Sequence, residues 1–93
     1  MSFEWREDEF AYIDDDGRML ADIGFKSINE GRTYVVERTW VDEDARGQGL
    51  AGKITAEFLK KVREEGKSVL PLCSYTQKYF EKHPEVQDIL FKR

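Results

Sequence analysis

The chain has 93 residues, of which 40% are hydrophobic and 13% aromatic, so it suits one small folded domain with a single core rather than a disordered segment. A formal net charge of −4 argues against bulk attraction to nucleic acid or to an anionic membrane. The single cysteine, Cys73, excludes an internal disulfide. There is no signal-peptide pattern and no apolar run of membrane-spanning length, so we expect a cytoplasmic protein without membrane contact.

The N-terminal half alternates between apolar and polar residues, which is typical of short strands with one buried face. Two strands are expected around Phe3 and Phe10, a third over residues 18–26 and a fourth over residues 32–41. In the fourth strand, the alternation places Tyr34, Val36, Arg38 and Trp40 on one face and Val35, Glu37, Thr39 and Val41 on the other. The short connections contain turn residues such as Gly17 and Gly31, so these strands should pair antiparallel.

The hydrophobic period then changes to that of a helix. Apolar residues recur at Ala51, Ile54, Phe58 and Val62, which predicts an amphipathic helix from about Gly47 to Glu65, ended by Gly66 as a left-handed cap. A buried strand follows over residues 68–72, where Pro71 has no N–H and should interrupt pairing. Residues 74–82 predict a short helix, and residues 86–90 suggest another turn or two.

This order of elements allows one parallel strand pair, across the helix, while the other pairs are antiparallel. We therefore expect an α+β fold with a mixed, mostly antiparallel sheet, one central helix packed on it and short C-terminal helices. The chain shows no internal repeat and no linker, so a single domain over residues 1–93 is expected.

The stretch from Arg46 to Lys53 fits three kinds of phosphate-binding loop. A P-loop needs Ser or Thr directly after the lysine, and Ile54 stands there instead. A dinucleotide fingerprint needs an opening β-α-β unit with an acidic residue after its second strand, and the strand ending at Leu72 has none. The third pattern, Arg46-x-x-Gly49-x-Ala51, is that of the pyrophosphate loop of acetyl-CoA-dependent acetyltransferases.

Together with the strand Thr39-Trp40-Val41 and the segment Pro71-Leu72-Cys73-Ser74-Tyr75, this loop resembles the GNAT superfamily of N-acetyltransferases, and within it a subfamily of short single-domain members. The resemblance implies acetyl-CoA as cosubstrate, no metal, and acetyl transfer to an amine on a protein, a peptide or a small molecule. The cofactor-binding residues that it implies are Trp40, Val41, Arg46, Gly47, Gln48, Gly49, Leu50, Ala51, Ser74 and Tyr75.

The loop residues make physical sense in that role. Gly47 and Gly49 lack Cβ atoms, so a pyrophosphate can approach the backbone closely. Because Arg46 offers no side-chain cap to a helix that starts at Gly47, a bound pyrophosphate could serve as the cap. The alternative is that Asp44 caps a helix that starts two residues earlier.

Two residues are the main candidates for catalysis. Cys73 falls between a strand and a helix, where the helix dipole favours a thiolate that could take the acetyl group or contact the reacting centre; the alternative is a small buried hydrophobe. The resemblance also makes Glu37 a candidate general base, because many members of the family use a strand glutamate, directly or through water; the alternative is a solvated strand glutamate. Relatives in the short subfamily often carry a histidine where this chain has Arg38, which cannot act as a base. Tyr75 and Tyr79 are candidate acids for the leaving thiolate, and His83 has no ligand cluster that would support a metal site.

The resemblance also shows one departure in size. Typical members place two helices between the first strands, whereas only strands and turns are expected between Phe10 and Arg38. An open acceptor side is therefore expected, which favours a bulky acceptor. The alternative function is a CoA-binding or protein-interaction module with little catalytic activity. A domain of this size should be a monomer or a weak homodimer.

Overall fold

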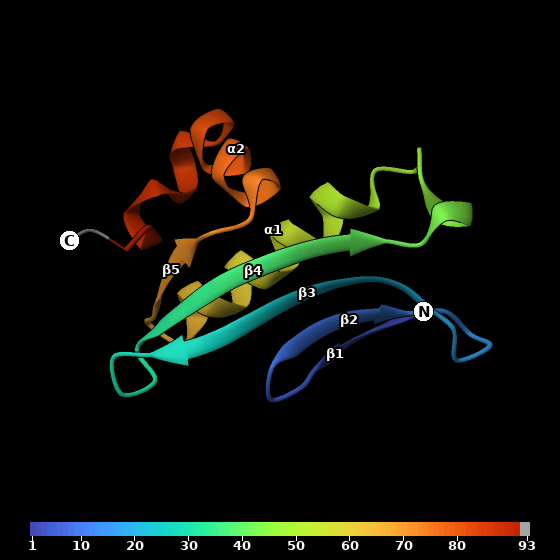
Figure 1. The fold of residues 1–93 in the computed structure, drawn as a ribbon, viewed down its shortest axis with the longest axis horizontal. Coiled ribbons are helices and arrows are strands. Elements are labelled where there is room, and N and C mark those ends of the chain that lie inside the picture. The colour runs from blue at the N-terminus through green and yellow to red at the C-terminus, as the bar shows by residue number, and fades with distance from the viewer. Residues whose placement is uncertain (92–93) are drawn as a thin grey trace.

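The computed structural model describes residues 1–91. Five strands alternate with short turns and helices along the chain (Figure 1). The strands are β1 (Ser2–Trp5), β2 (Glu9–Ile13), β3 (Met19–Ile28), β4 (Thr33–Val41) and β5 (Ser68–Pro71). The helices are α1 (Leu50–Glu64) and α2 (Ser74–Lys82), with short 3-10 helices η1 (Glu43–Ala45) and η2 (Pro84–Ile89).

The strands form one sheet in the order β1-β2-β3-β4-β5. The first four strands pair antiparallel, and β5 pairs parallel to β4 after the crossover through α1. Figure 1 shows α1 lying along the sheet and α2 beyond the end of β5. The predicted α+β class, with one parallel pair in a mostly antiparallel sheet, is confirmed.

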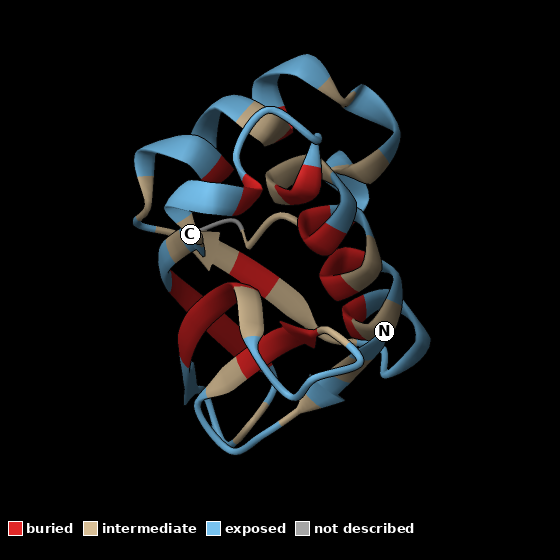
Figure 2. Cartoon of the chain, turned by 90° about the vertical axis from the view of Figure 1, so that its right-hand side faces the viewer, coloured by how far each residue is buried: buried red, intermediate tan, exposed pale blue. Residues whose placement is uncertain are grey.

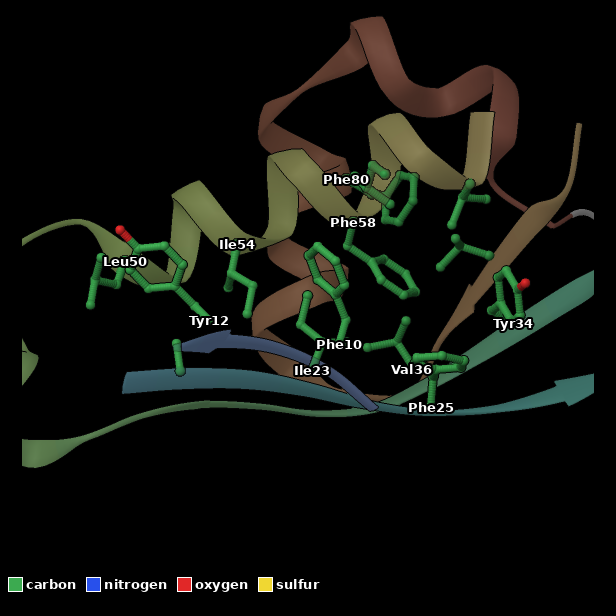
Figure 3. Close-up of a cluster of buried hydrophobic side chains, with 14 of the residues drawn as sticks. Phe10, Tyr12, Ile23, Phe25, Tyr34, Val36, Leu50, Ile54, Phe58 and Phe80 are labelled. Carbon is green, nitrogen blue, oxygen red and sulfur yellow. The ribbon is translucent and has the colours of Figure 1, made fainter. Parts of the chain in front are cut away.

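The core lies between α1 and one face of the sheet, as Figures 2 and 3 show. From α1, Leu50, Ile54, Phe58, Leu59 and Val62 are buried, and from the sheet Phe10, Tyr12, Ala21, Ile23, Phe25, Tyr34, Val36 and Val69. The predicted helical stripe is confirmed except at its start, where Leu50 is buried and Ala51 is only half-buried. This arrangement leaves the opposite face of the sheet without a helix in the described part of the chain.

The central helix begins later than its glycines suggested. Gly47 and Gly49 have φ values of +85° and +73°, in the left-handed region, so neither belongs to the helix, and α1 starts at Leu50. The other end is as predicted, since Gly66 has a φ of +68°. The N–H groups of Gly66 and Lys67 donate to the carbonyls of Arg63 and Val62, which closes the helix in a Schellman motif.

Strand β4 contains a bulge, and beyond it the alternation of side chains between the two sheet faces changes phase. Its pairing with β3 joins Val36 to Phe25 and Arg38 to Gly24, which leaves Glu37 as an extra residue. The predicted grouping of Arg38 and Trp40 with Tyr34 and Val36 is therefore wrong beyond Val36, because strict alternation does not continue through a bulge.

After the bulge, Thr39 and Val41 lie on the side of the helices. Val41 packs against the core, and the Thr39 hydroxyl lies 3.3 Å from the hydroxyl of Thr76 in α2. Arg38 lies on the opposite face, where its guanidinium donates to Asp22. The bulge thus sends neighbouring β4 residues to different sides of the sheet.

Turns alone connect β2, β3 and β4, so no helix separates Phe10 from Arg38, as predicted. The sheet face opposite α1 consequently exposes charged side chains rather than packing under a helix layer. No helix within residues 1–91 has the length and apolar character needed to cross a membrane.

Candidate functional site

The sheet opens between β4 and β5, where the two strands stop pairing. Their register ends at Val36 and Pro71, while β4 continues to Val41. The N–H groups of Leu72 and Cys73 then both donate to the Val36 carbonyl, at 2.9 and 3.1 Å, as the chain turns away into α2. The predicted interruption of pairing at Pro71 is confirmed, and it leaves the outer edge of β4 without a neighbouring strand.

The chain between β4 and α1 forms a structured loop with its own cap. The Asp42 carboxylate accepts the N–H of Asp44 at 2.9 Å and caps the short helix η1. The alternative that Asp44 caps the central helix is therefore wrong. The cap belongs to a separate turn, and α1 keeps a free N-terminus.

Among residues 1–91, no side chain caps the N-terminus of α1. The residue at the cap position is Gly49, and the first turn contains no acidic residue. The first helical hydrogen bond runs from the N–H of Lys53 to the Gly49 carbonyl, at 3.1 Å, so the preceding N–H groups have no acceptor within the helix. These N–H groups and the helix dipole make this end of α1 a ready anion site.

A hollow of about 230 Å³ lies at this helix end, lined by Val41, Arg46, Gly47, Gly49, Leu50 and Ala51. A Cβ atom built on Gly47 or Gly49 would meet nothing within 4 Å, so the space beside both glycines is open. The Arg46 Nε donates to the Val41 carbonyl at 3.3 Å, which ties the loop to the free edge of β4. The structure therefore brings most of the predicted loop residues around one hollow.

The other predicted cofactor-binding residues lie outside this hollow. Gln48 is exposed at the tip of the loop. Trp40 pairs with Asp22 on β3 and is 37% exposed on the sheet face opposite α1. Ser74 and Tyr75 form the first turn of α2, and the Tyr75 hydroxyl lies over α1, 3.6 Å from the position of a Cβ on Gly52.

Cys73 occupies the N-cap position of α2. Its Sγ lies 3.7 Å from Oγ1 of Thr39, to which the thiol donates, so the cysteine faces β4 where the strands separate. Burial raises the pKa of the thiol, but the N–H groups of Thr76 and Tyr75 and the hydroxyls of Thr39 and Thr76 together lower the pKa below its ordinary value. The site therefore favours the thiolate.

The lowered pKa predicts the pH at which the Cys73 thiol becomes reactive toward an alkylating reagent. Because the folded-state pKa is below the ordinary 9.0, alkylation by iodoacetamide should accelerate at a lower pH in the native chain than in the urea-unfolded chain. Thr39→Val should move the native profile back toward higher pH, since it removes one hydroxyl partner of the thiolate. If the alkylation rate depended on pH in the same way in the native and the unfolded chain, the lowered pKa of Cys73 would be contradicted.

Glu37 and Cys73 lie on opposite sides of the opening. The Glu37 carboxylate is 3.6 Å from the Lys26 ammonium, on the face away from α1, because the bulge directs it there. Cys73 contacts Thr39 on the helix side. The structure thus places the two candidates on either side of the free β4 edge rather than side by side.

Sequence reasoning did not single out Thr39 and Thr76 as part of this site. Their hydroxyls are 3.3 Å apart, and both act on the Cys73 sulfur. Thr76 follows Cys73 by three positions, which is the spacing from an N-cap to the first helical turn and could have revealed it. Thr39 could not be found in this way, because the bulge decides the side to which it points.

The remaining candidates sit along α2. Tyr79 and His83 stack with ring centroids 4.0 Å apart, and His83 Nδ1 lies 3.0 Å from the Glu85 carboxylate. Within the described residues, no group of three or more His, Cys, Asp or Glu side chains is placed to hold a metal ion.

The chain is similar to known proteins in both sequence and fold. Residues 4–89 match the family described as GCN5-related N-acetyl-transferase. No curated protein matches the sequence. Among solved structures, a GCN5-like protein from Staphylococcus aureus has a TM-score of 0.75 at 23% identity, with 99% of this chain and 89% of that chain covered.

Larger solved proteins share the same fold. The GNAT family protein YhbS from Escherichia coli, solved in complex with CoA, is 28% identical with a TM-score of 0.59, over 69% of this chain and 38% of that chain. Tetrahymena GCN5 has a TM-score of 0.66 at 14% identity, over 91% of this chain and 60% of that chain. This chain therefore spans less than two thirds of the length of either larger protein.

Proposed function

Because this chain belongs to the GCN5-related N-acetyltransferase family, we propose that it binds acetyl-CoA and transfers the acetyl group to an amine. The observation that carries the proposal is the free N-terminus of α1, with left-handed Gly47 and Gly49, next to a β4 edge that lacks a partner. The E. coli relative was solved in complex with CoA, which supports the same cosubstrate here.

In this proposal the pyrophosphate lies in the hollow at the start of α1. The unpaired N–H groups of Leu50 and Ala51 would donate to it, and the two glycines leave room for it beside the backbone. Arg46 forms no ion pair with a described carboxylate within 4 Å, so its charge is available to the phosphates. Gln48 would contribute backbone only, since its side chain points to solvent.

The pantetheine arm would enter the opening between β4 and β5. The Val41 carbonyl faces this opening, because it accepts Arg46 from outside the sheet. Backbone groups of alternate strand residues share an edge, so those of Thr39 face it as well. Ser74 and Tyr75 border the same opening from α2. Trp40 lies on the opposite face, so we place its side chain with the acceptor rather than with CoA.

Acetyl transfer requires a nucleophile to attack the thioester carbonyl, the C–S bond to break, and a thiolate to leave. We assign two stages to Cys73: its thiolate first attacks acetyl-CoA and the CoA thiolate leaves, and the amine nitrogen then attacks the acetyl-Cys73 thioester and releases the Cys73 thiolate. The low thiol pKa and the Thr39 contact support this assignment. Burial and the neighbouring Cys73 charge raise the pKa of the Tyr75 phenol, so Tyr75 carries its proton at neutral pH and is the candidate donor to the departing CoA thiolate.

Glu37 would accept the proton that the attacking amine loses, directly or through water. It stands on the other side of the free β4 edge, so the amine would arrive from the sheet face opposite α1. No helix of the described part of the chain covers that face between β2 and β4, so a peptide or protein amine can reach it without a closed pocket. This openness supports a bulky acceptor.

One experiment separates a transferase from a CoA-binding module. The purified protein is incubated with acetyl-CoA alone and then with a panel of amines and peptides, while intact mass and free thiol are followed. Acetylation of Cys73, followed by its loss when an acceptor is added, is the expected result. If Cys73→Ala transfers acetyl groups as fast as the wild type, the covalent role is excluded; if CoA binds without any turnover, the module is the better description.

The cofactor loop can be tested independently of turnover. Gly49→Val should lower CoA affinity at least about tenfold, because a branched residue at a φ of +73° costs about 1–3 kcal/mol and its side chain would occupy the space proposed for the pyrophosphate. The matched control is Gly17→Val, since Gly17 has a similar φ of +82° in the turn between β2 and β3. The measurement is the thermal shift caused by CoA, and equal shifts in both variants would contradict the loop assignment.

A further inference from the structure

Three residues on the sheet face opposite α1 form a row across β2, β3 and β4, next to the bulge in β4. Gly24 is paired with Glu9 on one side and with Arg38 on the other. Gly24 has no side chain, so the Arg38 guanidinium lies over its backbone, and a Cβ built on Gly24 would lie 2.6 Å from Arg38 Cζ. The guanidinium reaches the Asp22 carboxylate, with Nη2 at 2.7 Å from Oδ2 and Nε at 3.4 Å from Oδ1. Gly24 therefore leaves open the path along which Arg38 reaches Asp22.

Asp22 depends on this contact because it is buried. It lies in the next row, between Ala11 and Trp40, and is 2% exposed although no helix of residues 1–91 covers this face. A buried carboxylate without a hydrogen-bond donor is strongly disfavoured. Among the described side chains, Arg38 alone donates to Asp22, and it does so from this face of the sheet. Asp22 therefore fixes the face on which Arg38 has to lie.

The sequence of β4 also fits a regular register without the bulge. In that register Arg38 and Trp40 would join Val36 on the side of α1, and Thr39 would turn to the opposite face. Apart from the charge of Arg38, this arrangement is the strict apolar alternation that is typical of a strand with one buried face. It would place the guanidinium against the core and leave Asp22 without a donor. Both costs arise from the Arg38–Asp22 pair, and both favour the bulged register.

We propose that the Arg38–Asp22 pair determines the register of β4 and thereby positions Thr39 beside Cys73. Arg38 is a positioning residue, since it lies on the sheet face away from Cys73 and acts through the bulge. The bulge turns Thr39 to the helix side, where its hydroxyl lies 3.7 Å from the Cys73 sulfur. Setting a register is the best-attested use of a buried charged group. The inference does not depend on acetyl transfer, because the register and the reactivity of the thiol are both measured without CoA.

The main test is the double variant Asp22→Ala/Arg38→Leu, which removes both charges together and so leaves neither one unpaired. Cross-strand nuclear Overhauser contacts should then show the register without the bulge, in which Thr39 faces residue 22 instead of Ile23. Alkylation of Cys73 by iodoacetamide at neutral pH should slow about twofold to fivefold, because the Thr39 hydroxyl no longer reaches the thiolate. Gly24→Ala is a second variant that keeps both charges. Its Cβ would displace the guanidinium, so the contacts and the rate should change in the same direction.

The matched control is Arg18→Ala, which removes an arginine paired with an aspartate, Asp42, elsewhere on the same sheet. This variant should keep the contact between Thr39 and Ile23 and the wild-type alkylation rate, and circular dichroism shows which variants are folded. The inference is overturned if a folded Asp22→Ala/Arg38→Leu or Gly24→Ala variant keeps both, or if Arg18→Ala changes the register as well. A wild type that transfers no acetyl group would instead refute the proposed function and leave the result on the register unchanged.

Discussion

Replacing Phe58 by alanine should lower the free energy of unfolding by about 3–5 kcal/mol, the cost typical of removing a buried aromatic ring. Phe58 is 1% exposed, at the centre of the core that Figure 3 shows. Its ring centroid lies 5.3 Å from that of Trp5, 5.4 Å from Phe25 and 6.0 Å from Phe10, so truncation opens a cavity between α1 and three strands. For a domain of this size, the loss is a large part of the total stability.

Urea denaturation followed by circular dichroism measures the change. Lys60→Ala is the matched control, since Lys60 is exposed on the same helix and its loss should change stability by less than about 0.5 kcal/mol. A loss below about 1 kcal/mol for Phe58→Ala would show that this ring does not organise the core.

Removing Arg38 should have the second largest effect, about 1–3 kcal/mol, because it leaves the buried Asp22 carboxylate without its hydrogen-bond donor. The Asp22 side chain is 3% exposed, and the Arg38 Nη2 donates to it at 2.7 Å. To reach Asp22, the Arg38 side chain crosses Gly24: a Cβ built there would lie 2.4 Å from Nη1. Arg38→Ala should therefore destabilise the sheet next to the bulge in β4.

A double-mutant cycle separates the interaction energy between Asp22 and Arg38 from the effect of losing packing contacts. Asp22→Ala, Arg38→Ala and the double variant should show coupling of more than about 1 kcal/mol, because the double variant no longer contains an unpaired buried charge. Arg18→Ala is the control: Arg18 is about as exposed as Arg38, but its partner Asp42 is less buried than Asp22, so its loss should cost no more than about 1 kcal/mol. Additive single effects at Asp22 and Arg38 would contradict the argument.

The Asp22–Arg38 pair also bears on function, because it sits on the face from which the acceptor is proposed to arrive. Glu9 joins the pair, with a carboxylate oxygen 3.8 Å from Arg38, and Glu37 and Lys26 continue the charged surface along β3 and β4. Arg38 donates to the buried aspartate and, being permanently charged, cannot act as a base. Glu37, the bulge residue, stays our proposed base.

Local patterns in the sequence were sufficient for the order and type of the elements. The alternation in the first half, the stripe of Ile54, Phe58 and Val62, and the cap at Gly66 each depend on residues within a few positions of one another. The same holds for the loss of pairing at Pro71, which follows from a missing N–H. The family resemblance also rested on short motifs, and the match over residues 4–89 confirms it.

The start of α1 shows where local pattern was insufficient. Glycines tolerate both helical and left-handed backbone, so the sequence could not tell whether Gly47 and Gly49 open the helix or precede it. In the structure both are left-handed, which moves the free helix end to Leu50 and leaves Asp42 to cap a different turn. The glycine motif located the loop of the proposed anion site, and the folded loop determined its geometry.

The sequence by itself determined the α+β architecture and the family, and it located the loop that we propose binds the pyrophosphate, because those depend on short-range periodicity and on residue types that few other conformations accept. Only the tertiary structure decided which side chains meet at the opening between β4 and β5. The bulge at Glu37 arises from the register between β4 and β3, and it turns Thr39 toward Cys73 and Trp40 away from it. Pairing between distant segments sets that register, so no pattern within β4 alone could reveal it.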